Sequence, residues 1–268
     1  MKTYARTLTI AGSDSGGGAG IQADLKTFAA LGCYGLSVIT ALTAQNTKAV
    51  TGIMPVPPAF IAEQLEAVLS DIGVDAVKIG MLHSAEVIEQ VAKTLSQFEI
   101  KAIVLDPVMV AKSGDKLLQH EAVDALKTYL LPIASVITPN LPEASVLLGR
   151  PVETFADMPQ AAMDLATLCP GAILVKGGHL PIAESTDLLY LSASDQHWFP
   201  TNRIPTDNSH GTGCTLSSAI AAGLAKGLSM TDAVAAAKEY LTQALRAGAD
   251  YKLGHGHGPV HHFFNVWE

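Results

Sequence analysis

Residues 208–217 read NSHGTGCTLS and lead into the alanine-rich segment 217–225, SSAIAAGLA. This composition predicts a glycine-rich turn followed by a helix. Such a turn leaves the first backbone N–H groups of the helix without intrahelical partners, and the helix dipole adds about half a positive charge there. The stretch therefore predicts an anion site suited to phosphate, with Cys214 at its tip. The alternative for this pattern alone is a turn that only begins a helix.

Length, composition and charge bound the class of protein. The chain has 268 residues, of which 49% are hydrophobic and 16% charged, which predicts a globular chain with a large core. Its net charge of -8 argues against nucleic acid as a partner, because nucleic-acid binding normally needs a basic face. No apolar stretch is long enough to span a bilayer, so we expect no membrane partner.

The cysteines and the N-terminus indicate the compartment. The three cysteines, Cys33, Cys169 and Cys214, cannot all pair and form no Cys-x-x-Cys motif, so neither a disulfide framework nor a zinc site is predicted. The apolar run at 8–12 is too short for a signal peptide. Both features favour a reducing, cytoplasmic setting.

Apolar runs and amphipathic segments alternate along the chain, a pattern typical of a mostly parallel sheet with helices on both faces. The expected strands are 6–11, 36–44, 76–82, 102–105, 135–138 and 172–175. The expected helices are 21–31, 59–72, 85–98, 121–130, 156–168, 217–225 and 230–247. Segments 187–191 and 196–199 predict a small antiparallel hairpin. We therefore expect a single domain, 1–268, folded as an α/β three-layer sandwich whose right-handed crossovers gather the strand-end loops at one edge.

A second glycine-rich loop, GSDSGGGAG at 12–20, joins the first expected strand to the first expected helix. It lacks the acidic residue that follows the second strand in dinucleotide-binding folds, and the chain has no Gly-Lys-Ser/Thr phosphate loop. Gln45 instead lies just past the second strand. Its neutral amide offers both a donor and an acceptor, so it can read a heteroaromatic ring bearing an amino group. The alternative for Gln45 is a solvated loop residue.

Three later strands end at polar residues that suit a metal ion or phosphate. Asp106 follows a buried strand, with a simple turn acid as the alternative. Asn140 and Glu143 share a turn stiffened by two prolines and suit Mg²⁺ held mainly through water, although Glu143 also fits the first turn of a helix. Lys176 can neutralise phosphate as a point charge, or else lies in a surface turn. Four histidines between 255 and 262 sit among glycines and a proline, which favours a folded-down loop over a metal site.

Seven blocks of sequence, in this order, resemble the ribokinase-like small-molecule kinases. The closest resemblance is to the branch that phosphorylates hydroxymethylpyrimidine and its phosphate in thiamine biosynthesis. The blocks are AGSDSGGGAGIQADLKT at 11–27, VITALTAQNT at 38–47, KIGML at 78–82, LDPVM at 105–109, TPNLPEA at 138–144, KGGH at 176–179 and HGTGCTLS at 210–217.

The resemblance implies a ribokinase-like α/β/α sandwich, usually a homodimer, that transfers a phosphoryl group from ATP with Mg²⁺. Its acceptor would be 4-amino-5-hydroxymethyl-2-methylpyrimidine, converted first to the monophosphate and then to the diphosphate. The pyrimidine-binding residues by position would be Gln45, Gly12, Asp24, Met81 and Val108. The nucleotide-binding residues would be Lys176, Asn140 and Thr212, and the metal would be served by Asp106 and Glu143. The catalytic group would comprise Cys214, Gly211, Gly213 and Lys176.

Cys214 is the informative departure from the wider family, in which many members carry aspartate there as a base for the substrate hydroxyl. A thiol at a helix N-terminus has a lowered pKa, so a partial thiolate acting as the base is one expectation. A side chain that only positions the acceptor is the other. Because phosphoryl transfer depends mostly on positioning and charge stabilisation, the loop amides are expected to contribute more than the thiol.

Three alternatives remain open from the residues. A pyridoxal or pyridoxine kinase on the same scaffold would bind a ring of similar size that also carries a hydroxymethyl group. A non-catalytic pyrimidine-binding or sensor protein is opposed by the intact Asn140, Glu143 and Lys176. A thiol hydrolase using Cys214 has only His210 close along the chain, and no histidine and acid can be assigned as its partners.

Overall fold

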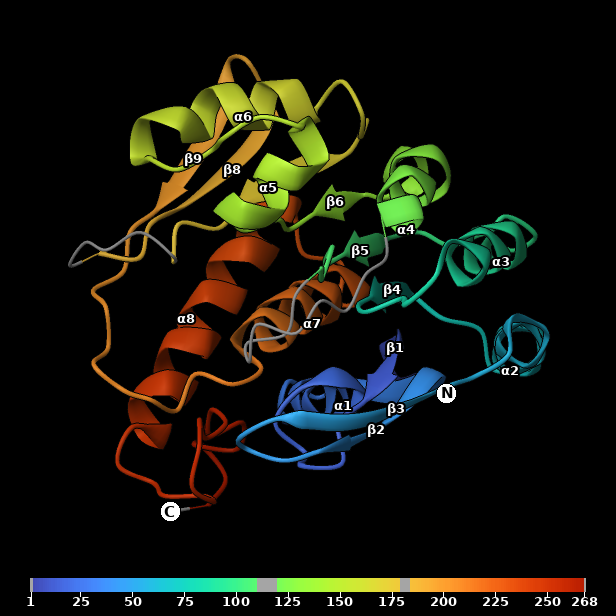
Figure 1. The fold of residues 1–268 in the computed structure, drawn as a ribbon, viewed down its shortest axis with the longest axis horizontal. Coiled ribbons are helices and arrows are strands. Elements are labelled where there is room, and N and C mark those ends of the chain that lie inside the picture. The colour runs from blue at the N-terminus through green and yellow to red at the C-terminus, as the bar shows by residue number, and fades with distance from the viewer. Residues whose placement is uncertain (1, 110–119, 179–183, 268) are drawn as a thin grey trace.

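The computed structural model describes residues 2–109, 120–178 and 184–267, so His179 of the KGGH block lies outside the described residues. One nine-stranded sheet runs through them, covered by helices on both faces (Figure 1). The strands are β1 (Arg6–Ser13), β2 (Tyr34–Gln45), β3 (Val50–Pro55), β4 (Ala76–Ile79), β5 (Ile103–Leu105), β6 (Val136–Ile137), β7 (Ala172–Val175), β8 (Asp187–Ser192) and β9 (Asp195–Phe199). The helices are α1 (Gly20–Ala30), α2 (Pro58–Asp71), α3 (Ala85–Leu95), α4 (His120–Ala125), α5 (Leu141–Leu148), α6 (Met158–Leu165), α7 (Thr212–Ala225) and α8 (Met230–Gly248).

The sheet is parallel at its centre and antiparallel at both ends. The strand order is β3-β2-β1-β4-β5-β6-β7-β8-β9, and the pairs from β2 through β7 are parallel. The predicted hairpin of β8 and β9 is confirmed as antiparallel. The hairpin joins the parallel strands through β8, which pairs antiparallel with β7. The antiparallel pair at the other end, β2 with β3, was not predicted, because β3 is a largely exposed edge strand with no apolar run and ends at Pro55.

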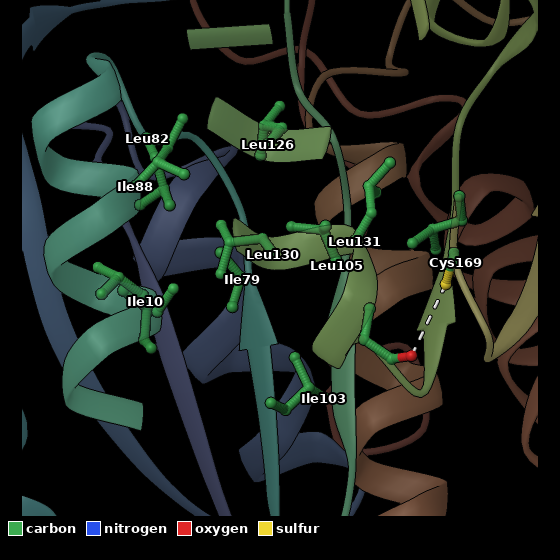
Figure 2. Close-up of a cluster of buried hydrophobic side chains, with 14 of the residues drawn as sticks. Ile10, Ile79, Leu82, Ile88, Ile103, Leu105, Leu126, Leu130, Leu131 and Cys169 are labelled. Atoms are coloured by element: carbon green, nitrogen blue, oxygen red, sulfur yellow. Dashed lines mark hydrogen bonds between the residues drawn. The ribbon is translucent and has the colours of Figure 1, made fainter. Parts of the chain in front are cut away.

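The expected three-layer sandwich is confirmed by two separate apolar clusters. Helices α1, α7 and α8 cover one face of the sheet, and α2 to α6 cover the other (Figure 1). Successive residues of β5 alternate between the layers: Ile103 and Leu105 face the cluster under α2 to α6, and Val104 faces the α7 side. Figure 2 shows the cluster under α2 to α6, in which the labelled side chains from strands include Ile10, Ile79, Ile103 and Leu105. Each leucine or isoleucine buried there contributes about 1.5–3 kcal/mol.

Helix boundaries near the site differ most from the sequence expectation. Helix α7 begins at Thr212 rather than at Ser217, so Gly211 is its N-cap and Gly213 lies in its first turn. The stiff turn at 139–143 begins helix α5, the alternative that the sequence left open for Glu143, and Pro142 falls in the first helical turn, where its missing N–H costs nothing. The expected helix 121–130 is α4 followed by a π-helical turn, Leu126–Leu130. Among the described helices, none has the length and apolar character needed to cross a membrane.

Candidate active site

The entrance of α7 is set by a glycine that no other residue can replace. Gly211 caps the helix with a φ of +79°, in the left-handed region, and a side chain there would collide with the carbonyl oxygen of Gly18. Within the described residues no side chain caps the helix, and a backbone bond from Thr215 N–H to Gly211 O closes its first turn. The three N–H groups of 212–214 precede the first intrahelical bond, and that they bind an anion stays a prediction.

An ion pair lies directly against this entrance. Lys176 Nζ donates to Asp106 Oδ1 at 2.9 Å, and Thr138 Oγ1 donates to the same oxygen at 3.0 Å. A Cβ built on Gly213 would lie 3.5 Å from Asp106 Oδ2 and 3.6 Å from Lys176 Nζ. The side chain of Lys176 is only 13% exposed, so it does not belong to a surface turn. The ends of β5 and β7 therefore meet the start of α7, the convergence expected from the strand-end loops.

Mutual attraction keeps both members of this pair charged. Burial alone would lower the pKa of Lys176, but Asp106 and Glu143 raise it above its usual value. Burial raises the pKa of Asp106, but the charges of Lys176 and Lys78 outweigh it and hold that pKa below its usual range. A charged ammonium group thus lies close to the first turn of α7, where the helix N-terminus adds partial positive charge.

Asn140 and Glu143 form the N-terminal cap of α5 and also approach Lys176. Asn140 N–H donates to Glu143 Oε2 at 2.8 Å, and Glu143 N–H donates to Asn140 Oδ1 at 2.9 Å, which is a reciprocal capping box. Lys176 Nζ lies 3.8 Å from Glu143 Oε2. Burial and the nearby Asp106 charge raise the pKa of Glu143 to about 7, against the opposing pull of Lys176. Glu143 is therefore both the acid in the first turn of α5 and a neighbour of Lys176.

These carboxylates fit a Mg²⁺ ion shared with phosphate, but not a cage made of protein alone. Within residues 2–109, 120–178 and 184–267, no group of three or more His, Cys, Asp or Glu side chains could hold a metal ion. Asp106 and Glu143 nevertheless both approach Lys176, beside the first turn of α7. Mg²⁺ commonly uses one or two carboxylates, with phosphate oxygens and water completing its shell. The donor set at this edge of the sheet suits that mode of binding.

The residues expected to line the pyrimidine pocket are partly brought together. A Cβ on Gly12 would lie 2.6 Å from Met81 Cε, so these two residues touch. Gln45 is the last residue of β2 rather than the first residue beyond it, and its Nε2 lies 3.4 Å from His210 Nε2, just ahead of α7. Val108 is partly exposed after β5, and its place in the pocket stays a prediction.

Asp24 is saturated by internal partners and has no exposed surface. Its two carboxylate oxygens accept from Lys78 Nζ at 3.0 and 2.9 Å, from Thr9 Oγ1 at 2.6 Å and from Ser218 Oγ at 2.7 Å. Asp24 and Lys78 are both fully buried. Direct contact between Asp24 and a substrate would require breaking these bonds, so its position indicates support of the pocket from beneath.

Lys78 was missed as a site residue, although the sequence carried a signal for it. A lysine in the apolar strand Ala76–Ile79, buried on every side, requires a partner of opposite charge. It is held charged, because Asp24 raises its pKa against the effect of burial. Its charge also acts on Asp106 and Cys214, so it contributes to the field under the start of α7.

The thiol of Cys214 is neutral, which corrects the expectation of a partial thiolate. Burial raises its pKa to about 11; Lys78 and the Gly20 N–H lower it, while Asp24 and Asp106 raise it further. Desolvation and two carboxylates thus outweigh the helix N-terminus. Of the two roles open from the sequence, positioning of the acceptor is the one this environment supports.

The C-terminal tail is folded down, as expected, against the start of α7. His210 N–H donates to Gly258 O at 3.0 Å, and His257 N–H donates to Thr47 O at 2.9 Å. The side chain of His210 turns to Asp14, with Nε2 lying 2.8 Å from Oδ2. Among the described residues, the side-chain hydrogen bonds of His210 go to Asp14 and Gln45 and none joins it to the Cys214 thiol, which weakens the thiol-hydrolase alternative.

The arrangement of open helix amides, a lysine and two carboxylates at one sheet edge is that of a phosphoryl-transfer site. Residues 14–261 match the sequence profile of the family described as phosphomethylpyrimidine kinase. The chain is 53% identical to the hydroxymethylpyrimidine/phosphomethylpyrimidine kinase of Rhizobium meliloti, over 97% of this chain and 98% of that protein. The chain therefore belongs to the phosphomethylpyrimidine kinase family.

Two further relatives bear on the reaction. The chain is 53% identical over 95% of its length to a thiamine biosynthesis bifunctional protein of Geobacter sulfurreducens, of which it spans 51%. Among solved structures, it superposes with a TM-score of 0.91 and 36% identity on the pyridoxal kinase from Staphylococcus aureus in complex with ADP, covering 99% of this chain and 96% of that one. The ribokinase-like sandwich expected from the sequence is thereby confirmed.

We expect alkylation of Cys214 to accelerate steeply with pH. With a thiol pKa of about 11, iodoacetamide should react about tenfold faster per pH unit from about pH 7 to about pH 10. Mass spectrometry of timed samples measures the rate at this one cysteine, and Cys214→Ser controls for Cys33 and Cys169, which are both buried. A rate that levels off below about pH 9 would restore the thiolate expected from the sequence.

Replacing Glu143 by glutamine should stabilise the protein at alkaline pH far more than at acidic pH. The pKa of Glu143 rises from 4.5 to about 7 on folding, so its contribution to stability is fully present below pH 4.5 and is lost as the pH rises through 7. Glutamine stays neutral and can still accept from Asn140 N–H. Urea unfolding without Mg²⁺ or nucleotide should show a gain of up to about 3 kcal/mol at about pH 8 and much less at about pH 5.

The matched control for this measurement is Glu99→Gln, because Glu99 is exposed and outside the site. It should leave the free energy of unfolding unchanged at both pH values. An equal gain for Glu143→Gln at both pH values would show that Glu143 is ionised throughout and would contradict the raised pKa.

Proposed function

We propose that this protein uses ATP to phosphorylate 4-amino-5-hydroxymethyl-2-methylpyrimidine, and then phosphorylates the monophosphate to the diphosphate, in thiamine diphosphate biosynthesis. The observation that carries the proposal is the open entrance of α7 lying against the Lys176–Asp106 pair. The names of the Rhizobium and Geobacter relatives support the substrate class and the pathway. The ADP bound to the Staphylococcus kinase supports ATP as the phosphoryl donor.

In this reaction the acceptor oxygen forms a bond to the γ-phosphorus while the bond to ADP breaks. Charge then lies on the three oxygens of the transferring group, and the chain stabilises it by positioned donors rather than by covalent chemistry. The amides of 212–214 donate to those oxygens, and Lys176 offsets their charge. One such donor is worth about 3–4 kcal/mol of barrier. Cys214 holds the acceptor as a neutral thiol, and the proton of the acceptor hydroxyl passes to an oxygen of the transferred phosphoryl group.

The remaining site residues would serve the nucleotide and its metal. Asn140 lies beside Lys176, and Thr212 is the first residue of α7. Both would contact phosphate. Asp106 and Glu143 would hold Mg²⁺, directly or through water. When bound, that ion would supply positive charge that neutralises part of the phosphate charge.

A pyridoxal kinase is the second candidate function. The specific observation that favours it is the TM-score of 0.91 to the Staphylococcus aureus pyridoxal kinase. The identity to that protein, 36%, is lower than the 53% to the Rhizobium pyrimidine kinase, so we place the pyrimidine first. The two alcohols differ in ring chemistry, and a site that makes polar ring contacts discriminates between them strongly.

We further propose that the chain works as a single kinase domain, in the cytoplasm and as a homodimer. The continuous sheet from β3 to β9 supports one domain. The hairpin of β2 and β3 exposes Leu42, Ile53 and Met54, which gives a second copy an apolar surface. Sedimentation at several protein concentrations measures the assembly.

The proposal predicts ATP consumption with hydroxymethylpyrimidine and with its phosphate, faster than with pyridoxal at equal concentration. Lys176→Met should lower kcat for both pyrimidines by about 100- to 1000-fold, because it removes a charge that acts on the transferring group. Lys176→Arg keeps the positive charge and should recover part of the loss. Circular dichroism checks that each variant is folded. Wild-type protein that consumes no ATP with either pyrimidine would refute the proposal.

A further inference from the structure

Four polar side chains form a chain of contacts beside the start of α7. Asp14 Oδ2 lies 2.8 Å from His210 Nε2, and the same imidazole nitrogen lies 3.4 Å from Gln45 Nε2. On its other side, Gln45 Oε1 lies 3.2 Å from Thr43 Oγ1. The side chain of Asp14 is only 3% exposed and that of His210 is 18% exposed, so the imidazole is held from the inside. None of the sequence motifs assigned a role to Asp14, His210 or Thr43 in ligand recognition.

The hydrogen between Asp14 and His210 belongs to the imidazole. Asp14 also accepts from the backbone N–H groups of Gly16, Gly18 and Ala19 at 2.8, 3.0 and 2.8 Å. Burial alone would raise the pKa of Asp14, but the bonds from His210 and the backbone lower it overall. A carboxylate has no proton to give, so His210 Nε2 is the donor. It therefore cannot accept a hydrogen from the amide nitrogen of Gln45.

Thr43 imposes the same requirement from the other side. Its hydroxyl donates to Ser13 O at 2.7 Å, which uses its one hydrogen. Thr43 Oγ1 is then an acceptor toward Gln45, and an acceptor requires the NH₂ end of the amide. The oxygen and nitrogen of a glutamine amide exchange places by a half-turn about the last torsion, and the hydrogen-bond network decides between the two arrangements. Both neighbours favour the arrangement with oxygen toward His210 and NH₂ toward Thr43. The single Nε2 hydrogen of His210 goes mainly to Asp14 at 2.8 Å and is shared only weakly with the Gln45 oxygen at 3.4 Å, whereas an NH₂ group there would face a donor.

We infer that the Asp14–His210 pair and Thr43 together lock the Gln45 amide in this single orientation, and that His210 is a specificity-determining positioning residue. The locked amide keeps one N–H and one oxygen lone pair for a ligand. A ring nitrogen next to an exocyclic amino group presents the complementary acceptor and donor, as in the 4-aminopyrimidine. Pyridoxal has no amino group beside its ring nitrogen. The inference rests on the proposed function, because it assumes that Gln45 contacts the pyrimidine ring.

The test compares two alcohols that differ only in the amino group: the 4-amino-5-hydroxymethyl-2-methylpyrimidine and its analogue without that group. His210→Met removes the donor at matched side-chain length, and His210→Gln keeps a donor. We expect the kcat/KM of the amino-bearing alcohol, divided by that of its analogue, to fall about 5- to 10-fold in His210→Met. This is the effect of losing about one hydrogen bond that orients the amide. The ratio should be largely retained in His210→Gln, with KM for ATP unchanged in both variants.

Thr43→Val carries the same test if His210→Met does not fold, because it removes the acceptor on the other side of the amide. It should also lower the ratio, mainly through KM of the amino-bearing alcohol. An unchanged ratio in folded variants would overturn the inference, and so would an equal loss with both alcohols. If wild-type protein phosphorylates neither alcohol, the proposed function fails, which is a different outcome from an unchanged ratio.

Discussion

The site depends on one close backbone approach, that of Gly211 to Gly18. No side chain fits between them, and the backbone of Gly211 is left-handed, so only glycine can begin α7 against the first glycine-rich loop. This contact leaves the amides of 212–214 uncapped, and it places them at the edge where β5 and β7 end. The two glycine-rich loops, which are far apart in the sequence, therefore touch through their backbones and form one structural unit.

Buried charges set the chemistry around that unit. Lys78 and Asp24 lie beneath the helix entrance with no exposed surface, and Lys176 and Asp106 lie beside it. Every carboxylate in this group has an ammonium partner, which is the condition under which buried ions persist. Burial, reinforced by the charges of Asp24 and Asp106, explains why Cys214 stays a neutral thiol at a helix N-terminus. In the proposed reaction, charge stabilisation would therefore fall to lysines and amides rather than to a thiolate.

Much of the architecture was predictable because the central strands are apolar runs and the helices are amphipathic. Strand β3 was not, since an exposed edge strand carries no apolar pattern, and α5 was only an alternative, since two prolines suggest a turn. Asp106, Glu143 and Lys176 could be placed at one edge because each follows an expected parallel strand, and right-handed crossovers gather the ends of such strands. The burial of Asp24, the pairing of Lys78 and the His210–Gln45 contact could not, because they join residues far apart in sequence.

The most direct test of the account is the backbone amide spectrum of 211–214 in ¹⁵N-labelled protein. Spectra would be recorded before and after adding Mg²⁺, ADP, aluminium fluoride and hydroxymethylpyrimidine, a mixture that imitates the transferring phosphoryl group. The account predicts downfield proton shifts at Thr212, Gly213 and Cys214 larger than those elsewhere in α7, because these N–H groups would donate to anionic ligand atoms. Unmoved signals at these three residues, while signals around Lys176 shift on binding, would contradict it.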